Sequence, residues 1–176
     1  MDEDLERLAD LVRRRNEVDR AVAELIGRPA TPGNIGEFVA ARVFRIELVT
    51  SGSHPGYDGV FGHGPMAGRT VNIKAYSRHE SIVDVGPHPC DYYLVLTGPS
   101  GPAKDLPWRI DSIFLFDTGR LMEGLRRRGV KVGVATSVLK ADWEAARIFP
   151  PGPDSPLPLS ENQVHLLSLF AQPPGS

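Results

Sequence analysis

Two hydrophobic periods follow one another along the chain. Over the first 26 residues, apolar side chains recur mostly every three or four positions, the spacing of one face of an α-helix; they are Leu5, Leu8, Val12, Val18, Val22 and Leu25. Gly27 is a suitable end for this helix, and the segment 28–33, rich in proline and glycine, separates it from a second predicted helix over 34–43. Thr31 is placed to cap the second helix, with Pro32 in its first turn.

After position 45 the pattern changes to short segments rich in β-branched and aromatic residues, which predict strands. These segments are 46–50, 57–61, 69–76, 92–96, 110–116 and 130–135, and 81–85 could add a short extra strand. The run 92–96 is apolar throughout, as expected of a strand buried on both faces. Further helices are predicted over 118–128, closed by Gly129, over 139–148, and from Ser160, where Gln163 is placed for a capping box.

This order of elements predicts an α/β or α+β fold, with a mixed sheet of about five or six strands flanked by helices. Strand 110–116, helix 118–128 and strand 130–135 suggest a crossover unit, which favours a mixed sheet. We expect four segments: an N-terminal helix over 1–27, a core over 33–149, a proline-rich linker over 150–159 and a C-terminal helix with its tail over 160–176. The N-terminal helix is expected to cover the core or to mediate self-association into a homodimer.

Composition narrows the class of protein but does not name a function. The 176 residues are 41% hydrophobic and 24% charged, which excludes wholesale disorder, collagen and coiled coil as classes. The formal net charge of -2 excludes a protein that coats nucleic acid by bulk charge. A single cysteine, an acidic N-terminus and the lack of a long apolar run lead us to expect a cytoplasmic protein with no membrane partner.

The most informative chemistry lies between residues 37 and 74. Asn72 and Lys74 are two apart on one predicted strand, so both side chains point to the same face. If strands 57–61 and 69–76 form a hairpin, Asp58 meets this face at one end. Asp58 and Glu37 supply anionic oxygens and Asn72 a neutral one, a ligand set that suits Mg²⁺. Lys74 could stabilise a hydroxide or the charge that develops on a phosphorus centre.

Each of these residues also has an ordinary structural interpretation. Lys74 could extend into water, Asp58 could be a turn residue, and Glu37 could pair with an arginine such as Arg42. Their joint spacing favours a functional interpretation. Basic residues near the hairpin are candidates for contact with nucleic-acid phosphates, and these are Arg69, Arg78 and His79.

These motifs resemble those of the PD-(D/E)xK, or restriction-endonuclease-like, nuclease superfamily. The resemblance covers roughly residues 33 to 97 and rests on the helix with Glu37, the strand opening Gly56-Tyr57-Asp58-Gly59, the hairpin and the strand with Asn72-Ile73-Lys74. A narrower resemblance to bacterial proteins of unassigned activity covers most of the chain, through 33–38, 68–74 and 91–98.

The resemblance implies a nuclease that uses Mg²⁺ or Mn²⁺ to hydrolyse phosphodiester bonds of DNA, with RNA as the alternative substrate. Asp58, Glu37 and the Asn72 amide would hold the metal, and Lys74 would position or deprotonate the attacking water. Two features depart from the superfamily: an amide replaces the usual acid at Asn72, and 77–91 lacks the helical period of the helix that usually follows the lysine strand. The alternative is a catalytically inactive nuclease-like module that binds nucleic acid or a protein partner.

Overall fold

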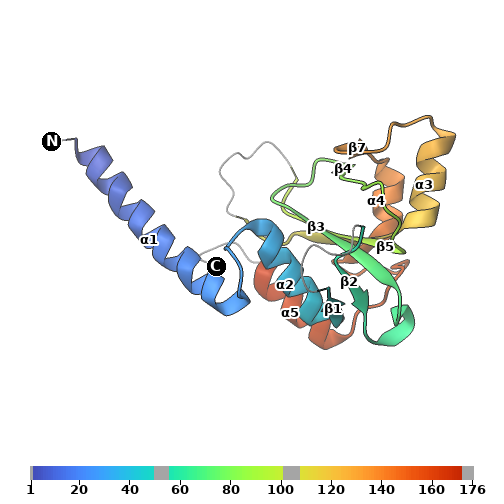
Figure 1. The fold of residues 1–176 in the computed structure, drawn as a ribbon, viewed down its shortest axis with the longest axis horizontal. Helices are drawn as coiled ribbons and strands as arrows, with labels where there is room; N and C mark the ends of the chain where they lie inside the picture. Colours follow the sequence, from blue (N-terminus) through green and yellow to red (C-terminus); the bar gives the residue numbers. More distant parts are fainter. Residues whose placement is uncertain (1, 50–55, 101–107, 172–176) are drawn as a thin grey trace.

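The computed structural model describes residues 2–49, 56–100 and 108–171, and within them the chain forms helices on both faces of a mixed sheet (Figure 1). The α-helices are α1 (Glu3–Ile26), α2 (Pro32–Phe44), α3 (Thr118–Arg127), α4 (Lys140–Ala146) and α5 (Glu161–Ala171), with a 3-10 turn, η1 (Gly64–Met66). The strands are β1 (Ile46–Leu48), β2 (Gly59–Phe61), β3 (Thr70–Tyr76), β4 (Ile82–Val83), β5 (Tyr92–Thr97), β6 (Ser112–Asp117), β7 (Thr136–Ser137) and β8 (Arg147–Phe149). The predicted α/β architecture is confirmed.

The main sheet has six described strands in the order β1-β2-β3-β5-β6-β8. Strands β1, β2 and β3 form an antiparallel meander, and β3 then pairs in parallel with β5 from Val71 to Tyr76. The pairs β5–β6 and β6–β8 are antiparallel. The lysine strand β3 is therefore central, with a hairpin partner on one side and a buried parallel strand on the other.

Two hydrophobic cores lie on opposite faces of this sheet. Helices α2 and α5 cover the first core, which includes Val39, Leu167 and the inward side chains Val71 and Ile73 of β3. Helices α3 and α4 cover the second core around Trp143. Because side chains alternate along a strand, Asn72 and Lys74 face the side of the second core.

Local signals fix the first two helices where the sequence places them. Asp2 caps α1 by accepting a hydrogen bond from the amide of Leu5, and Gly27 ends it at φ 71°. Thr31 caps α2 through its hydroxyl, with Pro32 in the first turn. The predicted capping box of α5 also forms, between Ser160 and Gln163.

The predicted strand over 130–135 and the crossover unit built on it are wrong. Gly133 takes φ 158° and Ala135 φ 56°, and the Thr136 hydroxyl bonds both the amide and the carbonyl of Gly133, so this stretch is a turn. Strand β7 follows it and pairs with β4 in a separate two-stranded sheet. The mixed character of the main sheet comes instead from the parallel β3–β5 pair.

The helix predicted over 139–148 is shorter than expected. Helix α4 ends at Ala146, and Arg147–Phe149 form β8, which pairs with the edge of β6. Ile148 and Phe149 are buried in the first core, so sheet pairing overrides the helical period there. Among the described residues, no helix combines the length and the apolar character that crossing a membrane requires.

Candidate active site

Asp58 occupies the end of the β2–β3 hairpin, immediately before β2. Its amide donates to the carbonyl of Val71 at 2.9 Å, and its carbonyl accepts from the amide of Val49 at 3.0 Å. The carboxylate Oδ2 accepts a 2.6 Å hydrogen bond from the amide of Ile73. The side chain of Asp58 therefore takes the place of a main-chain acceptor beside β3. Its other carboxylate oxygen, Oδ1, does not take part in the bond to Ile73.

Asn72 lies on β3 with its amide group turned toward the loop before Asp58. Its Nδ2 donates to the carbonyl of Gly56 at 3.3 Å. Its Oδ1 is buried and has no hydrogen-bond partner among the described residues. A buried acceptor without a donor is costly, which makes this oxygen the feature of the site that most needs a ligand.

Lys74 follows two residues later on the same face of β3, as predicted. The side chain is half-buried, and no ion pair links it to a described carboxylate. The structure thus brings Asp58, Asn72 and Lys74 to one end of the hairpin. A lysine placed beside an acid and not neutralised by it can hold a water molecule or an anion there.

Tyr93 completes this cluster, and the sequence did not single it out. It pairs with Asn72 across the parallel β3–β5 ladder, and its hydroxyl accepts from the amide of Gly86 at 3.1 Å. Burial raises the pKa of Tyr93, and the neighbouring Cys90 and Asp58 raise it further. The parallel pairing of two strands far apart in sequence creates this contact, so strand alternation alone gave no signal for it.

Cys90 is a packing residue of the same face. It is 8% exposed, its Sγ lies 3.6 Å from the Thr118 hydroxyl oxygen, and burial raises the pKa of its thiol. A thiol that is held protonated is a poor nucleophile.

Glu37 lies on α2, the helix that covers the first core. Its Oε2 accepts from Nη1 of Arg28 at 2.5 Å, so it pairs with an arginine other than Arg42. The Arg42 guanidinium lies over the ring of Phe38 instead. Within the described residues, no three His, Cys, Asp or Glu side chains converge to hold a metal ion. A metal site here would combine Asp58 with the neutral Asn72. Glu37 pairs with Arg28 on the helix that covers the opposite face of the sheet, so the structure does not bring it together with Asn72 and Lys74.

Arg69 is exposed but paired. Its Nη1 lies 3.0 Å from Oδ1 of Asp91, whose other oxygen accepts from both the amide and the hydroxyl of Thr70 at 2.8 Å. These hydrogen bonds, with the amide of Thr70 first, hold the pKa of Asp91 below its usual range. The network ties the start of β3 to the start of β5.

His79 sits in an aromatic cluster. Its ring stacks on Phe114 at a centroid distance of 5.4 Å and meets Trp143 edge-on at 4.6 Å. Burial lowers the pKa of His79, although Asp111 acts in the opposite direction. The position indicates packing against the second core. The neighbouring Arg78 is half-buried and lines a small pocket of about 110 Å³ together with Tyr76.

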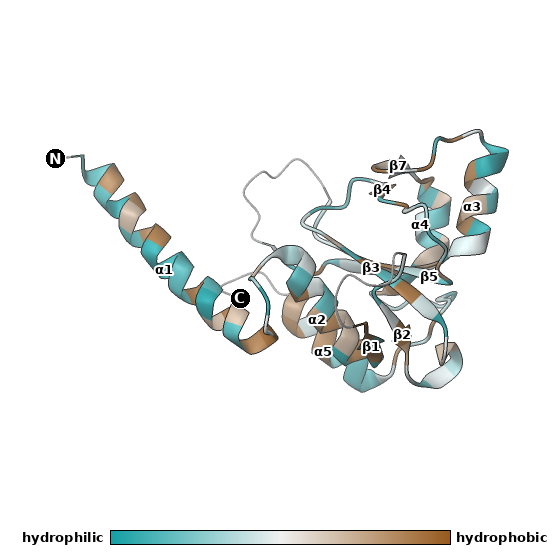
Figure 2. Ribbon diagram, viewed as in Figure 1, coloured by the Kyte–Doolittle hydropathy of each residue, from teal (hydrophilic) through white to brown (hydrophobic). Residues whose placement is uncertain are grey.

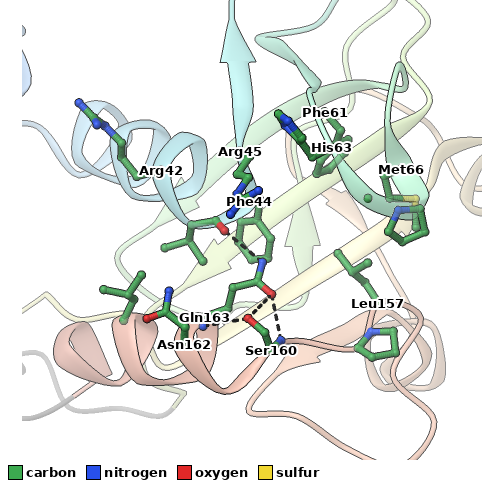
Figure 3. A pocket seen from close by; sticks show the side chains of 15 residues that line it. Arg42, Phe44, Arg45, Phe61, His63, Met66, Leu157, Ser160, Asn162 and Gln163 are labelled. Carbon is green, nitrogen blue, oxygen red and sulfur yellow. Dashed lines mark hydrogen bonds between the residues drawn. The ribbon is translucent and has the colours of Figure 1, made fainter.

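A pocket of about 390 Å³ lies elsewhere (Figure 3). It opens between the end of α2, the hairpin turn and the start of α5, and its polar lining includes Arg45 and His63. Gln163 borders it, with its Nε2 bonded to the carbonyl of Val43.

Neither a protein-family model nor a curated protein matches this chain.

Proposed function

We propose that the protein is a metal-dependent nuclease that hydrolyses phosphodiester bonds of DNA or RNA, with Asp58, Asn72 and Lys74 at its centre. The observation that carries this proposal is the buried Oδ1 of Asn72, which has no partner among the described residues and lies on the same face of the sheet as Lys74. Oδ1 of Asn72 has no described hydrogen-bond donor, and Lys74 has no ion pair with a described carboxylate. Together with Asp58, these groups suit a site that binds a cation and an anion together.

The residues present fit Mg²⁺ or Mn²⁺. Asp58 would hold the ion through the carboxylate oxygen that Ile73 does not use, and Asn72 through Oδ1. A bound ion would supply Lewis-acid polarisation of the scissile phosphate. Lys74 would orient the attacking water and stabilise the developing negative charge through its ammonium group.

The test compares cleavage of labelled single- and double-stranded DNA and RNA by the intact chain in Mg²⁺ or Mn²⁺. Asp58→Asn retains an acceptor for Ile73 but removes the charge, and Lys74→Ala removes the ammonium; we expect each variant to abolish cleavage. Asp154→Asn and Lys131→Ala make the same changes at exposed positions and should cut as the parent does. Cleavage that survives both site variants would overturn the proposal.

A specific observation favours the alternative, a nuclease-like module that binds nucleic acid or a protein without cleaving. The Arg28–Glu37 salt bridge engages one candidate ligand, and Asn72 adds no charge. Such a module should bind labelled DNA or RNA with strong salt dependence but cut nothing. Mg²⁺ separates the two functions, because an ion that binds the folded state raises the melting temperature of the enzyme and leaves that of the module unchanged.

A further inference from the structure

Helix α1 projects away from the body of the protein, and none of its 24 residues is buried (Figure 1). Large apolar side chains nevertheless lie along it, and most of them are more than half exposed: Leu5 61%, Leu8 55%, Leu11 52%, Val12 45%, Val18 62% and Leu25 75%. They alternate with charged residues along the helix in Figure 2. Helices in proteins gain most of their stability from packing an apolar face, so this face requires a partner.

We propose that α1 pairs with α1 of a second copy of this chain as an antiparallel two-stranded coiled coil. The heptad that begins at Leu8 puts Leu8, Arg15 and Val22 at a positions, and Leu11, Val18 and Leu25 at d positions. At about 36 Å, the helix is long enough for three such heptads.

The a and d positions of α1 are spaced symmetrically about a point between Asn16 and Glu17. In an antiparallel pair each a position meets a d position. Leu8 then faces Leu25 of the partner subunit, and Leu11 faces Val22 of the partner subunit. The third layer joins Arg15 to Val18 of the partner subunit, and the same three layers repeat beyond the axis. A surface that complements itself about a two-fold axis is the mark of an isologous dimer, so the favoured occupant is a second copy.

Charge selects the antiparallel orientation. A parallel pair would place Arg15 against Arg15 of the partner subunit, and would bring together two acidic first turns, each with Glu3, Asp4 and Glu6. The antiparallel pair places the stem of Arg15 against a valine. Its guanidinium keeps the 3.4 Å bond to Asp19 on its own helix and stays at the solvent edge.

The first test measures the solution mass of the intact chain by light scattering after size exclusion. We expect twice the chain mass for the wild type. Leu11→Asp puts a charge in two of the six layers and should halve the mass, whereas Ala9→Asp adds the same charge on an exposed site outside the stripe and should leave the dimer intact. A monomeric wild type, or a Leu11→Asp variant that stays dimeric, would overturn the proposal.

The second test distinguishes the two orientations with spin labels on Ala9→Cys and Asn16→Cys. Both positions lie on the same side of the helix, and unlabelled wild type controls for the buried Cys90. In the antiparallel dimer the two labels should lie about 10 Å farther apart at position 9 than at position 16, since position 9 is displaced from its copy by about 22 Å along the axis. Equal separations at both positions would establish a parallel pair and overturn this inference.

Discussion

The amide nitrogen of Ile73 lies 2.6 Å from Oδ2 of Asp58, so a side chain completes the hydrogen bonding of the central strand of the sheet. The main-chain bonds between this hairpin's two strands end with the Asp58 amide on the Val71 carbonyl, and the Asp58 carboxylate adds one more bond, to the amide of Ile73. Asp58 therefore has a structural role besides the catalytic role proposed for it, and the two roles can be separated by the choice of substitution.

Asp58→Ala should destabilise the fold by about 1 to 3 kcal/mol, because it leaves the amide of the buried Ile73 without an acceptor. Asp58→Asn retains an oxygen at the same place and should recover most of that loss. Chemical denaturation of both variants measures the difference. If cleavage is abolished equally in both while stability falls only in the alanine variant, the carboxylate charge acts in the reaction. Equal stability of the two variants would show that the bond to Ile73 contributes little.

Asn72→Asp replaces the amide on β3 with a carboxylate of nearly the same size. Without metal, the new carboxylate would be half-buried near Asp58, so both burial and like charge would raise its folded-state pKa. An acid whose pKa is raised on folding favours the folded state below its unfolded pKa of about 3.9, and that stability is lost as the pH rises. We therefore expect the variant to be less stable than wild type at neutral pH.

Mg²⁺ should reverse this loss. A second carboxylate raises affinity for the ion, so the melting temperature of Asn72→Asp should rise more with Mg²⁺ than that of the wild type. Asn162→Asp makes the same charge change at an exposed position and should respond as the wild type does. Absence of any Mg²⁺ response in Asn72→Asp would refute the metal site proposed at these residues.

Features governed by nearby residues could be predicted from the sequence. The caps at Thr31 and Ser160 depend on hydroxyl side chains and amides three residues away, and both form. The common face of Asn72 and Lys74 follows from strand alternation. The burial of β5 follows from its continuous apolar run.

Features governed by contacts between distant residues could not be predicted from the sequence. The run 130–135 has the alternating apolar residues of a strand, but Val134 is 89% exposed because the turn at Gly133 and Ala135 directs the chain toward β4 instead. The partner of Glu37 is Arg28, which the turn between α1 and α2 brings back across nine positions. The contact of Tyr93 with the site depends on which strands pair, and no local pattern encodes it.

Gly36 marks the closest approach of α2 to the sheet. A Cβ atom on Gly36 would lie 2.4 Å from Cβ of Ala75, so Gly36→Ala should push the helix away from β3 and destabilise the fold by about 1 to 3 kcal/mol. Gly33→Ala is the matched control on the same helix, because the nearest atom to its Cβ would be 4.0 Å away. That control should be neutral or stabilising by up to about 1 kcal/mol, through higher helix propensity. Equal effects of the two substitutions, measured by urea unfolding, would contradict the close packing.

The aromatic cluster around His79 predicts a pH dependence of stability. Burial lowers the pKa of His79 in the folded chain, so as the pH falls through the unperturbed value of 6.5 the unfolded chain takes up a proton before the folded chain does. The stability that the neutral ring contributes is complete above that pH and is lost as the pH falls toward the folded-state pKa.

His79→Phe should remove this pH dependence, because phenylalanine fills the space between Phe114 and Trp143 without titrating. We expect the free energy of unfolding to fall less between neutral and mildly acidic pH in this variant than in the wild type. His165→Gln alters an exposed histidine of α5 and should leave the wild-type pH dependence in place. If His79→Phe loses as much stability on acidification as His165→Gln does, some other group is responsible. If instead the pH dependence of the free energy of unfolding disappears, packing against Trp143 accounts for the position of His79. Contact of its ring with a phosphate is then not needed to explain that position.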